Sequence, residues 1–533
     1  MAIKVSTSGS ATDAAKRHLE SLVEAKFASR LFAEDPTLWG PAAEDESSKR
    51  LGWTNAAKVS QPLVPEIIAL RDSLRAKGID RIVLCGMGGS SLAPEVMTRT
   101  AGVELDVLDS TNPAQVRRAV EQDIERTAIV VSSKSGSTVE TDSQRRAFAT
   151  AFEAAGIDPA ERIVIVTDPG SPLETASREA GYTVFLADPN VGGRFSALTA
   201  FGLVPAGLAG LDIDAFLAEA GSVAAELAED STQNPGLLLG AAIAGTDPIK
   251  TFLGVVADGT SIVGFGDWAE QLIAESTGKE GKGLLPVVLD TDSPEIGLPI
   301  PDLQIARLVA DAAETPAVGD EINVSGGLAE QMLLWEVAVS VAGQIIGINP
   351  FDQPDVESAK AAARELLDAT PEPEAPVFQQ DAIAVRGTAS VVDGHTEVLE
   401  AIESLLAQLP ENGYVAIQAY ADRIGQPELA EIREFVAHRA RRPVTFGWAP
   451  RFLHSTGQFH KGGPRVGVFL QITTRESVDL AIEDRPFTFG ELIQAQAAGD
   501  ANVLEGHGMP VLRLELTDPV AGAEQLIAAL RNV

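Results

Sequence analysis

The chain has 533 residues, of which 45% are hydrophobic and 22% charged, a composition typical of a globular protein rather than a disordered one. This length exceeds one ordinary hydrophobic core, so two domains are expected. The formal net charge of −35 argues against nucleic-acid partners and against binding to anionic membranes, and we interpret it as a solubility feature.

Three features of the sequence indicate a cytoplasmic protein. The N-terminal residues lack the apolar stretch of a signal peptide. The longest apolar segment, residues 332–348, contains Glu336 and two other polar side chains, which predicts a core helix rather than a membrane span. The single cysteine, Cys85, cannot form an internal disulfide and fits a reducing compartment.

The first half of the chain predicts helices followed by β-α units. Helices are expected over residues 13–33 and 61–77, the second closed by Gly78 as a C-terminal cap. Five strand-like apolar runs then alternate with amphipathic helical stretches, at residues 81–85, 105–109, 128–132, 162–166 and 182–187. Short apolar runs separated by helices are typical of parallel strands buried on both faces. The pattern predicts a doubly wound α/β domain, in which ligands bind beyond the carboxyl ends of the strands.

A second set of strand-like runs follows, at residues 250–258, 413–422, 442–449, 466–472 and 511–516. It predicts a second, more interrupted α/β domain, with an exposed linker rich in Pro and Glu at residues 368–381 between its parts. We therefore expect an N-terminal helical segment over residues 1–60, a first domain over 61–230 and a second domain over 231–533.

The stretch GMGGSS joins the first predicted strand to a helix. Gly86, Gly88 and Gly89 place backbone N–H groups at a helix N-terminus, where they can hold an anion. The spacing matches the start of a dinucleotide fingerprint, with Ser91 in place of its third glycine. Dinucleotide binding, sugar-phosphate binding and tight packing alone all stay open for this motif.

The stretch SSKSGST, residues 132–138, gathers hydroxyl groups directly behind a buried strand. Capping of the following helix by Ser137 or Thr138 would explain one hydroxyl but leaves the others, such as those of Ser133 and Ser135, unexplained. A dinucleotide has no use for a second loop of this kind, whereas a phosphate monoester presents three terminal oxygens that need donors. The loop therefore predicts a phosphate site.

Two further segments contain candidates for the chemistry. In VGGRFSAL, two glycines ending at Gly193 let the backbone approach a ligand, and Arg194 could clamp a phosphate or stabilise an oxyanion. The alternative is a turn with a surface ion pair. In the segment 265–283, Gln271 and Glu275 share one helix face, which makes Glu275 a candidate general base. An ordinary surface glutamate is the alternative there.

The remaining candidates lie in the last third of the chain. Lys360 ends the Pro-punctuated stretch NPFDQPDVESAK. His454 and His460 follow the predicted strand at 442–449, and we expect the strand-end His454 to do acid–base work and His460 to be exposed. His507 stays unassigned. No cluster in the sequence has metal-ligand spacing, and no Ser-His-Asp pattern is readable.

Together these motifs resemble those of the phosphoglucose isomerase family, whose members consist of two doubly wound, flavodoxin-like sugar-isomerase domains with parallel sheets. The motifs GMGGSSL, SSKSGSTVET, VGGRFSAL, ESTGKEGKG and NPFDQPDVESAK stand in family order. The resemblance runs from about Leu51 to the C-terminus and is greatest to bacterial members found fused to transaldolase. It implies an α/β fold with N-terminal helices preceding the two domains.

The resemblance also implies a role for each motif residue. The residues expected to bind the substrate are Gly89, Ser90, Ser133, Lys134, Ser135, Ser137, Thr138, Gly193, Gln271 and Gln353. Glu275 would move a proton between two substrate carbons, and Arg194 would stabilise the enediolate. Lys360 would lie near the ring oxygen. LHSTGQF matches a bacterial motif, which makes His454 the ring-opening residue.

The position of the histidine motif departs from the family order. In the family it lies shortly after the glutamate motif, whereas here it follows FDQP by about a hundred residues. The second domain is therefore expected to have reordered segments. We expect the strand at 442–449 to deliver His454 to the cleft that contains Glu275 and Lys360. The loop 132–138 should line the same pocket, formed within one subunit or across a subunit boundary.

The activity implied by the resemblance is reversible isomerisation of glucose 6-phosphate and fructose 6-phosphate, a step of glycolysis and gluconeogenesis. It needs no cofactor and no metal, and its partner is a small sugar phosphate rather than nucleic acid or membrane. A homodimer is left open. The alternatives are an isomerase of broader specificity that includes mannose 6-phosphate, a non-catalytic sugar-phosphate-binding module, and a nicotinamide-dependent dehydrogenase.

Overall fold

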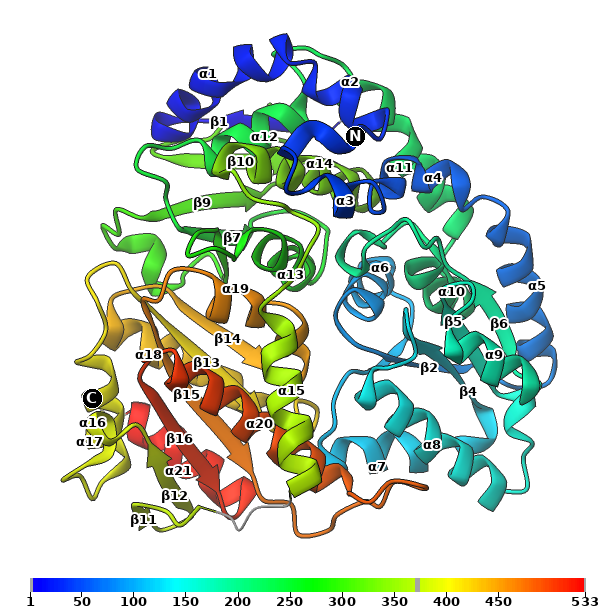
Figure 1. Ribbon diagram of the computed structural model, residues 1–533, viewed down its shortest axis with the longest axis vertical. Coiled ribbons are helices and arrows are strands. Elements are labelled where there is room, and N and C mark those ends of the chain that lie inside the picture. Colours follow the sequence, from blue (N-terminus) through cyan, green and yellow to red (C-terminus); the bar gives the residue numbers. More distant parts are fainter. Residues whose placement is uncertain (1–2, 370–373, 532–533) are drawn as a thin grey trace.

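The computed structural model describes residues 3–369 and 374–531, and the strands within them form three sheets (Figure 1). The predicted linker at 368–381 falls partly outside the described residues, and the described residues 374–377 are exposed. All three sheets are dominated by parallel pairs and covered by helices. The predicted α/β class with parallel sheets is confirmed.

The first sheet contains the five strands predicted in the first half of the chain, all parallel, in the order β3-β2-β4-β5-β6. Its strands are β2 (Arg81–Gly86), β3 (Asp106–Leu108), β4 (Thr127–Ser132), β5 (Ile163–Thr167) and β6 (Thr183–Leu186). The helices around it are α5 (Leu63–Ala76), α6 (Leu92–Ala101), α7 (Pro113–Glu121), α8 (Val139–Ala154), α9 (Pro172–Glu179) and α10 (Ala200–Ala209).

Both faces of the first sheet are buried because its strand residues are apolar in both alternating sets. In β2, Val83 and Cys85 pack against α7 and α8, whereas Ile82 and Leu84 belong to the core formed with α5, α6 and α10. The sheet is therefore doubly wound, and its loops at the carboxyl ends of β2 and β4 stand beside each other.

The second sheet has the order β1-β10-β9-β7-β8, with β1 antiparallel to β10 and the rest parallel. Its strands are β1 (Lys4–Thr7), β7 (Phe252–Ala257), β8 (Leu285–Leu289), β9 (Leu303–Leu308) and β10 (Glu321–Ser325). Its principal helices are α1 (Gly9–Glu24), α11 (Ile213–Leu227), α12 (Pro235–Ala244), α13 (Phe265–Thr277) and α14 (Leu328–Ile346). The predicted N-terminal helical segment thus also contributes a strand. The helix predicted over 13–33 is divided into α1 and α2 (Phe27–Phe32).

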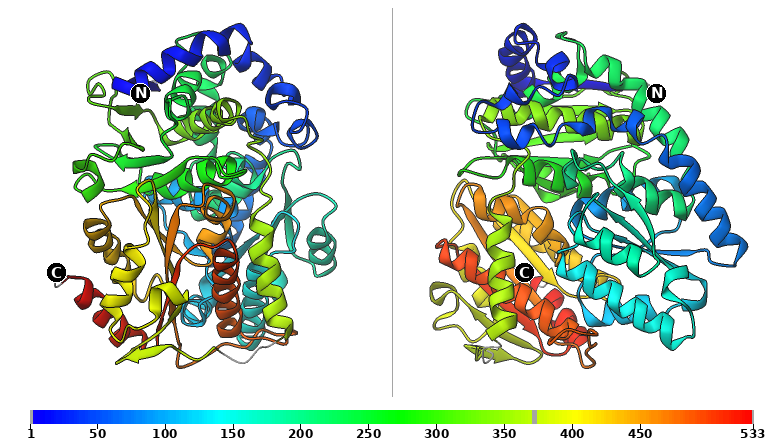
Figure 2. Two further views of the ribbon diagram at one scale, coloured as in Figure 1. Left: turned by 60° about the vertical axis from the view of Figure 1, so that its left-hand side comes forward. Right: turned by 45° about the vertical axis from the view of Figure 1, so that its right-hand side comes forward.

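The third sheet has the order β11-β12-β16-β15-β13-β14, antiparallel at β11-β12 and β12-β16 and parallel elsewhere. Its strands are β11 (Phe378–Gln380), β12 (Ile383–Gly387), β13 (Tyr414–Tyr420), β14 (Val444–Trp448), β15 (Gly467–Thr474) and β16 (Val511–Leu516). Its helices include α15 (Val356–Ala369), α17 (Val398–Leu406), α18 (Ile432–Ala440), α19 (Gly457–Gly462), α20 (Phe489–Gly506) and α21 (Pro519–Arg531). Helices α15 and α20 lie side by side in both views of Figure 2.

The second set of predicted strands is divided between two sheets rather than gathered in one. The run at 250–258 becomes β7 of the second sheet, and the other four runs become β13 to β16 of the third sheet. Apolar runs specify strands but not their neighbours, and β8, β9 and β10 between residues 285 and 325 complete the sheet around β7. The domain boundaries expected at residues 60 and 230 stay predictions.

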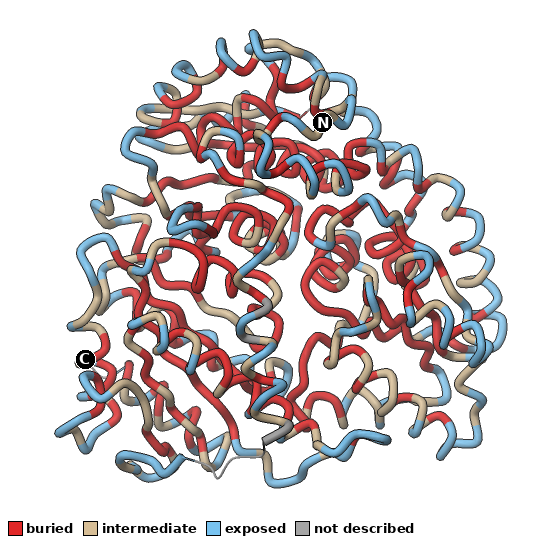
Figure 3. The backbone as a smooth tube through the Cα atoms, viewed as in Figure 1, coloured by how far each residue is buried: buried red, intermediate tan, exposed pale blue. Residues whose placement is uncertain are grey.

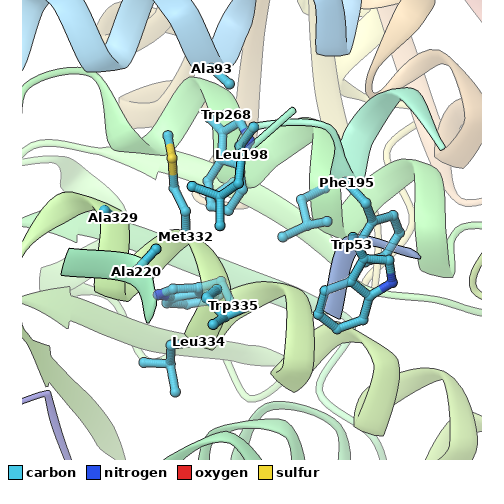
Figure 4. Close-up of a cluster of buried hydrophobic side chains, with 14 of the residues drawn as sticks. Trp53, Ala93, Phe195, Leu198, Ala220, Trp268, Ala329, Met332, Leu334 and Trp335 are labelled. Carbon is cyan, nitrogen blue, oxygen red and sulfur yellow. The ribbon is translucent and has the colours of Figure 1, made fainter. Parts of the chain in front are cut away.

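A continuous apolar core connects the first sheet to the second and fixes the back of α13. Figure 4 shows Trp268 of α13 and Trp335 of α14 in one cluster with Phe195, and Figure 3 shows the buried chain along the strands and inner helices. Phe265 lies edge-on to Trp268, with the ring centroids 5.3 Å apart. Because these rings hold α13 in the core, they also fix the positions of Gln271 and Glu275, which lie three and seven residues beyond Trp268 on the same helix.

Helix α14 contains most of the long apolar segment at 332–348, as the sequence predicts. Glu336 in its middle is 1% exposed, its carboxylate oxygens have no hydrogen-bond partner among the described residues, and burial raises its pKa well above the ordinary value. Among the helices of the described residues, none has the length and apolarity needed to cross a membrane.

Candidate active site

The hydroxyl loop lies between β4 and α8, at the carboxyl-end edge of the first sheet. Thr138 occupies the N-cap position of α8, but its side chain makes no capping bond. Its Oγ1 instead accepts from Ser133 Oγ at 3.3 Å, and Ser135 and Ser137 share a 2.7 Å hydroxyl contact. Ser133 is buried, whereas Ser135 and Ser137 are exposed. The hydroxyls are thus gathered in one loop and are not used to cap the helix.

Lys134 lies at one end of this loop, with its ammonium turned toward two neighbouring segments. Its Nζ is 2.8 Å from Asp168 Oδ2 and donates to the backbone oxygen of Val191 at 2.8 Å. Burial raises the pKa of Asp168, and the charge of Lys134 opposes that rise. A direct contact of Lys134 with phosphate therefore stays a prediction.

The glycine loop after β2 packs tightly against three other parts of the site. A Cβ at Gly89 would lie 2.0 Å from the backbone oxygen of Gly193, so the two glycine loops touch through their backbones. Gly88 has φ +55°, and a Cβ there would lie 2.7 Å from Gln271 Nε2 and 2.9 Å from the His454 oxygen. Both glycines are therefore required by close approach, and the adjacent Ser90 is half-buried beside them.

Arg194 and Glu275 form a buried ion pair, which excludes the surface pair considered from the sequence. The Arg194 side chain is 3% exposed, and its Nη1 lies 3.0 Å from Glu275 Oε1. The same Nη1 donates to Gln353 Oε1 at 3.0 Å, and Nη2 donates to the Pro350 oxygen at 2.7 Å. Burial lowers the pKa of Arg194, and the charge of Glu275 opposes this effect. The segments that contain Glu275 and Gln353 thus contact the guanidinium of Arg194, and the glycine loop at Gly89 touches the backbone beside it. The hydroxyl loop is the family motif that does not take part in these contacts.

Gln271 joins the candidate base to the displaced histidine segment. Its Nε2 donates to Glu275 Oε2 at 2.9 Å and to the backbone oxygen of His454 at 2.8 Å. The predicted pairing of Gln271 and Glu275 on one helix face is confirmed. Within a single chain, the amide of Gln271 therefore connects the carboxylate of Glu275 to the backbone of His454, which follows a strand of the third sheet.

Glu140 is a site residue that the sequence motifs did not single out. It is the second residue of α8 and 5% exposed, and its Oε1 lies 3.1 Å from His454 Nε2. Burial raises its pKa, but the charge and hydrogen bond of His454 and the charge of Lys360 outweigh burial and hold it below the ordinary value. Lys360 on α15 is half-buried and close enough for its charge to act there. The signal in the sequence was a carboxylate directly after the hydroxyl loop.

Two polar residues near the histidine motif are buried, and for His460 this contradicts the prediction from the sequence. His460 was expected to be exposed, but it is 3% exposed and lies among aromatic rings, including Tyr414 at 5.9 Å. Burial lowers its pKa well below the ordinary value. Lys279 is 1% exposed; burial lowers its pKa to about 8, and its Nζ donates to the Asn349 oxygen at 2.7 Å. Both side chains are therefore part of the packed interior of the protein rather than of its surface.

A buried ionic cluster, centred on Arg451, attaches the histidine segment to the first sheet. Arg451 donates through Nε to Asp109 Oδ2 and through Nη2 to Glu95 Oε2. Arg423 donates to the other oxygen of Glu95 at 3.0 Å. Burial raises the pKa of Glu95, but Arg451 and Arg423 outweigh burial and lower it to about 2. Because Arg451 begins the turn that ends at His454, this cluster sets the place of the histidine.

The fold and this site define an α/β protein in which a loop of hydroxyl groups, a buried carboxylate–arginine pair and a histidine lie at the carboxyl-end edge of a doubly wound sheet. No family model matches the chain. It is 30% identical over 368 residues to the glucose-6-phosphate isomerase of Rubrobacter xylanophilus, covering 55% of this chain and 84% of that one. It is 29% identical over 340 residues to the probable glucose-6-phosphate isomerase of Haloarcula marismortui, covering 54% and 78%. The chain belongs to the glucose-6-phosphate isomerase family, as the motifs indicated.

Two solved structures share the fold. A protein of Thermus thermophilus, described as hypothetical, matches with a TM-score of 0.58 at 23% identity, over 69% of this chain and all of that one. The glucose-6-phosphate isomerase of Chlamydia trachomatis matches with a TM-score of 0.54 at 21% identity, over 67% and 87%.

We predict that Arg451→Met lowers the free energy of unfolding at pH 7 by about 3 kcal/mol, because it removes one of the two cations of the buried carboxylates and leaves Arg423 alone to pair with Glu95 and Asp109. The low folded-state pKa of Glu95 means that its contribution is present above the ordinary pKa of 4.5 and is lost as the pH falls toward 2. Denaturant unfolding at pH 7 and at pH 4 measures both effects, and the difference between the two proteins should shrink at the lower pH.

The matched control is Arg126→Met, whose pair with Asp80 is exposed. It should leave unfolding nearly unchanged at both pH values. Equal effects of the two substitutions would contradict a special role for the Arg451 cluster.

Proposed function

We propose that the chain catalyses the reversible isomerisation of glucose 6-phosphate and fructose 6-phosphate through an enediolate. The observation that carries this proposal is the arrangement around Glu275, whose two carboxylate oxygens are held by Arg194 and Gln271 beside the backbone of His454. Family membership supports the same reaction.

In this proposal the hydroxyl loop binds the phosphate group. Ser133, Ser135, Ser137 and Thr138 donate hydroxyls to its oxygens, and the N-terminus of α8 favours the negative charge. The sugar ring then extends toward Glu275, past the touching glycine loops at Gly89 and Gly193, with Ser90, Gln271 and Gln353 around it. Anchoring at one end fixes which carbons reach the base.

Ring opening comes first in the proposed mechanism. His454, paired with Glu140, moves a proton between the anomeric hydroxyl and the ring oxygen, with Lys360 at the same end. The C–O bond of the ring breaks and the open-chain aldehyde forms. Glu275 then removes the proton from C2, and the electron pair moves onto the carbonyl oxygen at C1.

The enediolate that results carries negative charge beside Arg194, whose guanidinium stabilises it. Glu275 returns the same proton to C1, and the hydroxyl proton of C2 moves to the oxygen on C1. C2 thereby becomes the carbonyl carbon, C1 carries a hydroxyl group, and the ketose is complete. The electrons and protons balance within the substrate, so the scheme requires no redox partner and no resident cofactor.

The three alternatives from the sequence receive less support. A non-catalytic sugar-phosphate module has no need of a carboxylate paired with a buried arginine. In this protein the carboxylate of Glu275 is paired with the buried Arg194. Dinucleotide binding would require the first glycine loop to approach a pyrophosphate, but Gly88 and Gly89 already approach other parts of the protein. Activity on mannose 6-phosphate is compatible with the same site, and a cytoplasmic location and a homodimer stay predictions.

The primary test is a coupled assay of fructose 6-phosphate conversion, run with a chelator present. We predict that Glu275→Gln abolishes turnover yet still binds a sugar phosphate, because the amide keeps the shape of the carboxylate but cannot take the proton. The matched control is Glu280→Gln, which alters an exposed glutamate just beyond α13 and should leave activity unchanged. Near-normal turnover by Glu275→Gln would assign the base to another residue.

We predict that Thr138→Val mainly raises KM, by the equivalent of roughly 1–3 kcal/mol for a lost hydrogen bond to a charged group, with a smaller change in kcat. Thr150→Val on the exposed side of the same helix is its control and should behave as the wild type. Measurement of inorganic phosphate as a competitive inhibitor of both variants separates binding from turnover. An unchanged KM for Thr138→Val would remove this hydroxyl from the phosphate site.

We predict that Glu275→Gln and His454→Asn do not complement each other. Both residues serve a site formed within one chain, since Gln271 contacts them together. The two inactive variants are coexpressed with different tags, and the species that contains both chains is assayed. Activity above that of either variant alone would show that His454 serves a neighbouring subunit.

A further inference from the structure

The buried amide of Gln496 connects the third sheet to the active site, and the mechanism above leaves it unused. Gln496 lies on α20 and is 5% exposed. Its Nε2 donates to Glu140 Oε1 at 2.8 Å, and its Oε1 accepts from Thr111 Oγ1 at 2.7 Å. Both partners lie in segments that surround the first sheet. Glu140 is on helix α8, and Thr111 is in the loop that follows strand β3.

These two contacts fix the orientation of the amide. The Thr111 hydroxyl donates to the oxygen of Gln496, so the NH2 group faces the carboxylate of Glu140. The reversed orientation would set the amide oxygen against a carboxylate oxygen, with no proton between them. Thr111 therefore keeps Gln496 as a donor to Glu140.

The same oxygen of Glu140 also receives His454. An ionised carboxylate only accepts hydrogen bonds, so the His454 nitrogen that lies 3.1 Å away, Nε2, must carry a proton. A neutral ring then has its other nitrogen, Nδ1, as the atom that exchanges a proton with the substrate. This tautomer depends on Glu140 staying ionised and in place.

We propose that Gln496 is a positioning residue, which holds Glu140 as an oriented acceptor so that His454 keeps the tautomer and ring direction needed for ring opening. The inference rests on the proposed function, since ring opening is the step that uses His454. Gln496 does this from a helix of the third sheet, the sheet that also carries the histidine segment. Thr111, Gln496, Glu140 and His454 thus form one continuous line of hydrogen bonds across the boundary between the first and third sheets.

Other charged groups near the pair set the background against which Gln496 acts. Lys360 on α15 lowers the pKa of Glu140. Glu275 and its partner Arg194 lie on the far side of Gln271, whose amide bonds to the His454 backbone. In the described part of the chain, the contacts of Arg194 and Glu275 are with groups other than Gln496. Removal of the Gln496 amide therefore acts on the pair through its bond to Glu140.

The experiment compares Gln496→Leu with Gln494→Leu. Gln494 lies on the same helix and is exposed, and it donates to the Thr474 oxygen rather than to the pair. The chain has six histidines, so the His454 signal in the spectrum of the protein with carbon-13-labelled histidine is assigned by its loss in His454→Asn. Its titration is then followed in each variant, without substrate.

Loss of an N–H donor raises the affinity of the Glu140–His454 pair for a proton. We expect Gln496→Leu to raise the apparent pKa of the pair by about one unit and to lower kcat about tenfold, with KM within about twofold. Gln494→Leu should leave all three quantities unchanged. Thr111→Val, which keeps the Gln496 side chain, should shift the titration in the same direction by less.

An unshifted His454 titration in folded Gln496→Leu would overturn the proposal. If that variant does not fold, the same result in Thr111→Val overturns it. The titration needs no substrate, so it is independent of the proposed function. Suppose that the unsubstituted protein shows no isomerase activity, but that Gln496→Leu still shifts the His454 titration as expected. This result would reject the proposed function and support the role of Gln496 in orienting His454.

Discussion

The attachment of the histidine segment to the first sheet is the constraint on which the rest of the site depends. Arg451 lies between two carboxylates that the first sheet supplies, and all three groups are buried. A different position of the turn would leave at least one of these three charged groups without its partner. An unpaired charge that is removed from water is costly. The cluster therefore favours a single position of the turn that ends at His454. In this position the turn lies at the carboxyl-end edge of the first sheet, beside the glycine and hydroxyl loops.

Buried glutamines complete the connections that this ionic cluster begins. An amide offers both a donor and an acceptor, so one side chain can join two segments without adding charge. Gln271 joins α13 to the histidine segment, Gln458 joins α19 to Gly278 and Asp355, and Gln496 joins α20 to the first sheet. In a chain whose net charge is already −35, uncharged connectors beside Glu275 and Glu140 avoid further repulsion between carboxylates.

The features that depend on neighbours in the sequence could be predicted, and those that depend on tertiary partners could not. Alternating apolar runs located the strands of the first sheet, and a spacing of four placed Gln271 and Glu275 on one face. Lys279 was not recognised as buried, because its oxygen partners come from a loop some seventy residues away. Likewise, nothing local marks Gln496 as a contact of Glu140. Strand β7 pairs with β8 and β9, which come later in the chain. The apolar pattern alone does not show with which strands β7 pairs.

The displaced histidine motif shows why order along the chain is a weak guide to a site. A site requires certain groups at certain points in space, and the chain can reach those points in any order that leaves the sheets intact. Here the third sheet brings its own helices against the first, and its first connection beyond β14 carries both Arg451 and His454. Arg451 and His454 are the first and last residues of one short turn. The residue that attaches this segment to the first sheet therefore lies within the segment itself. A segment late in the chain can therefore reach the edge of the first sheet and contact Gln271, the partner of Glu275.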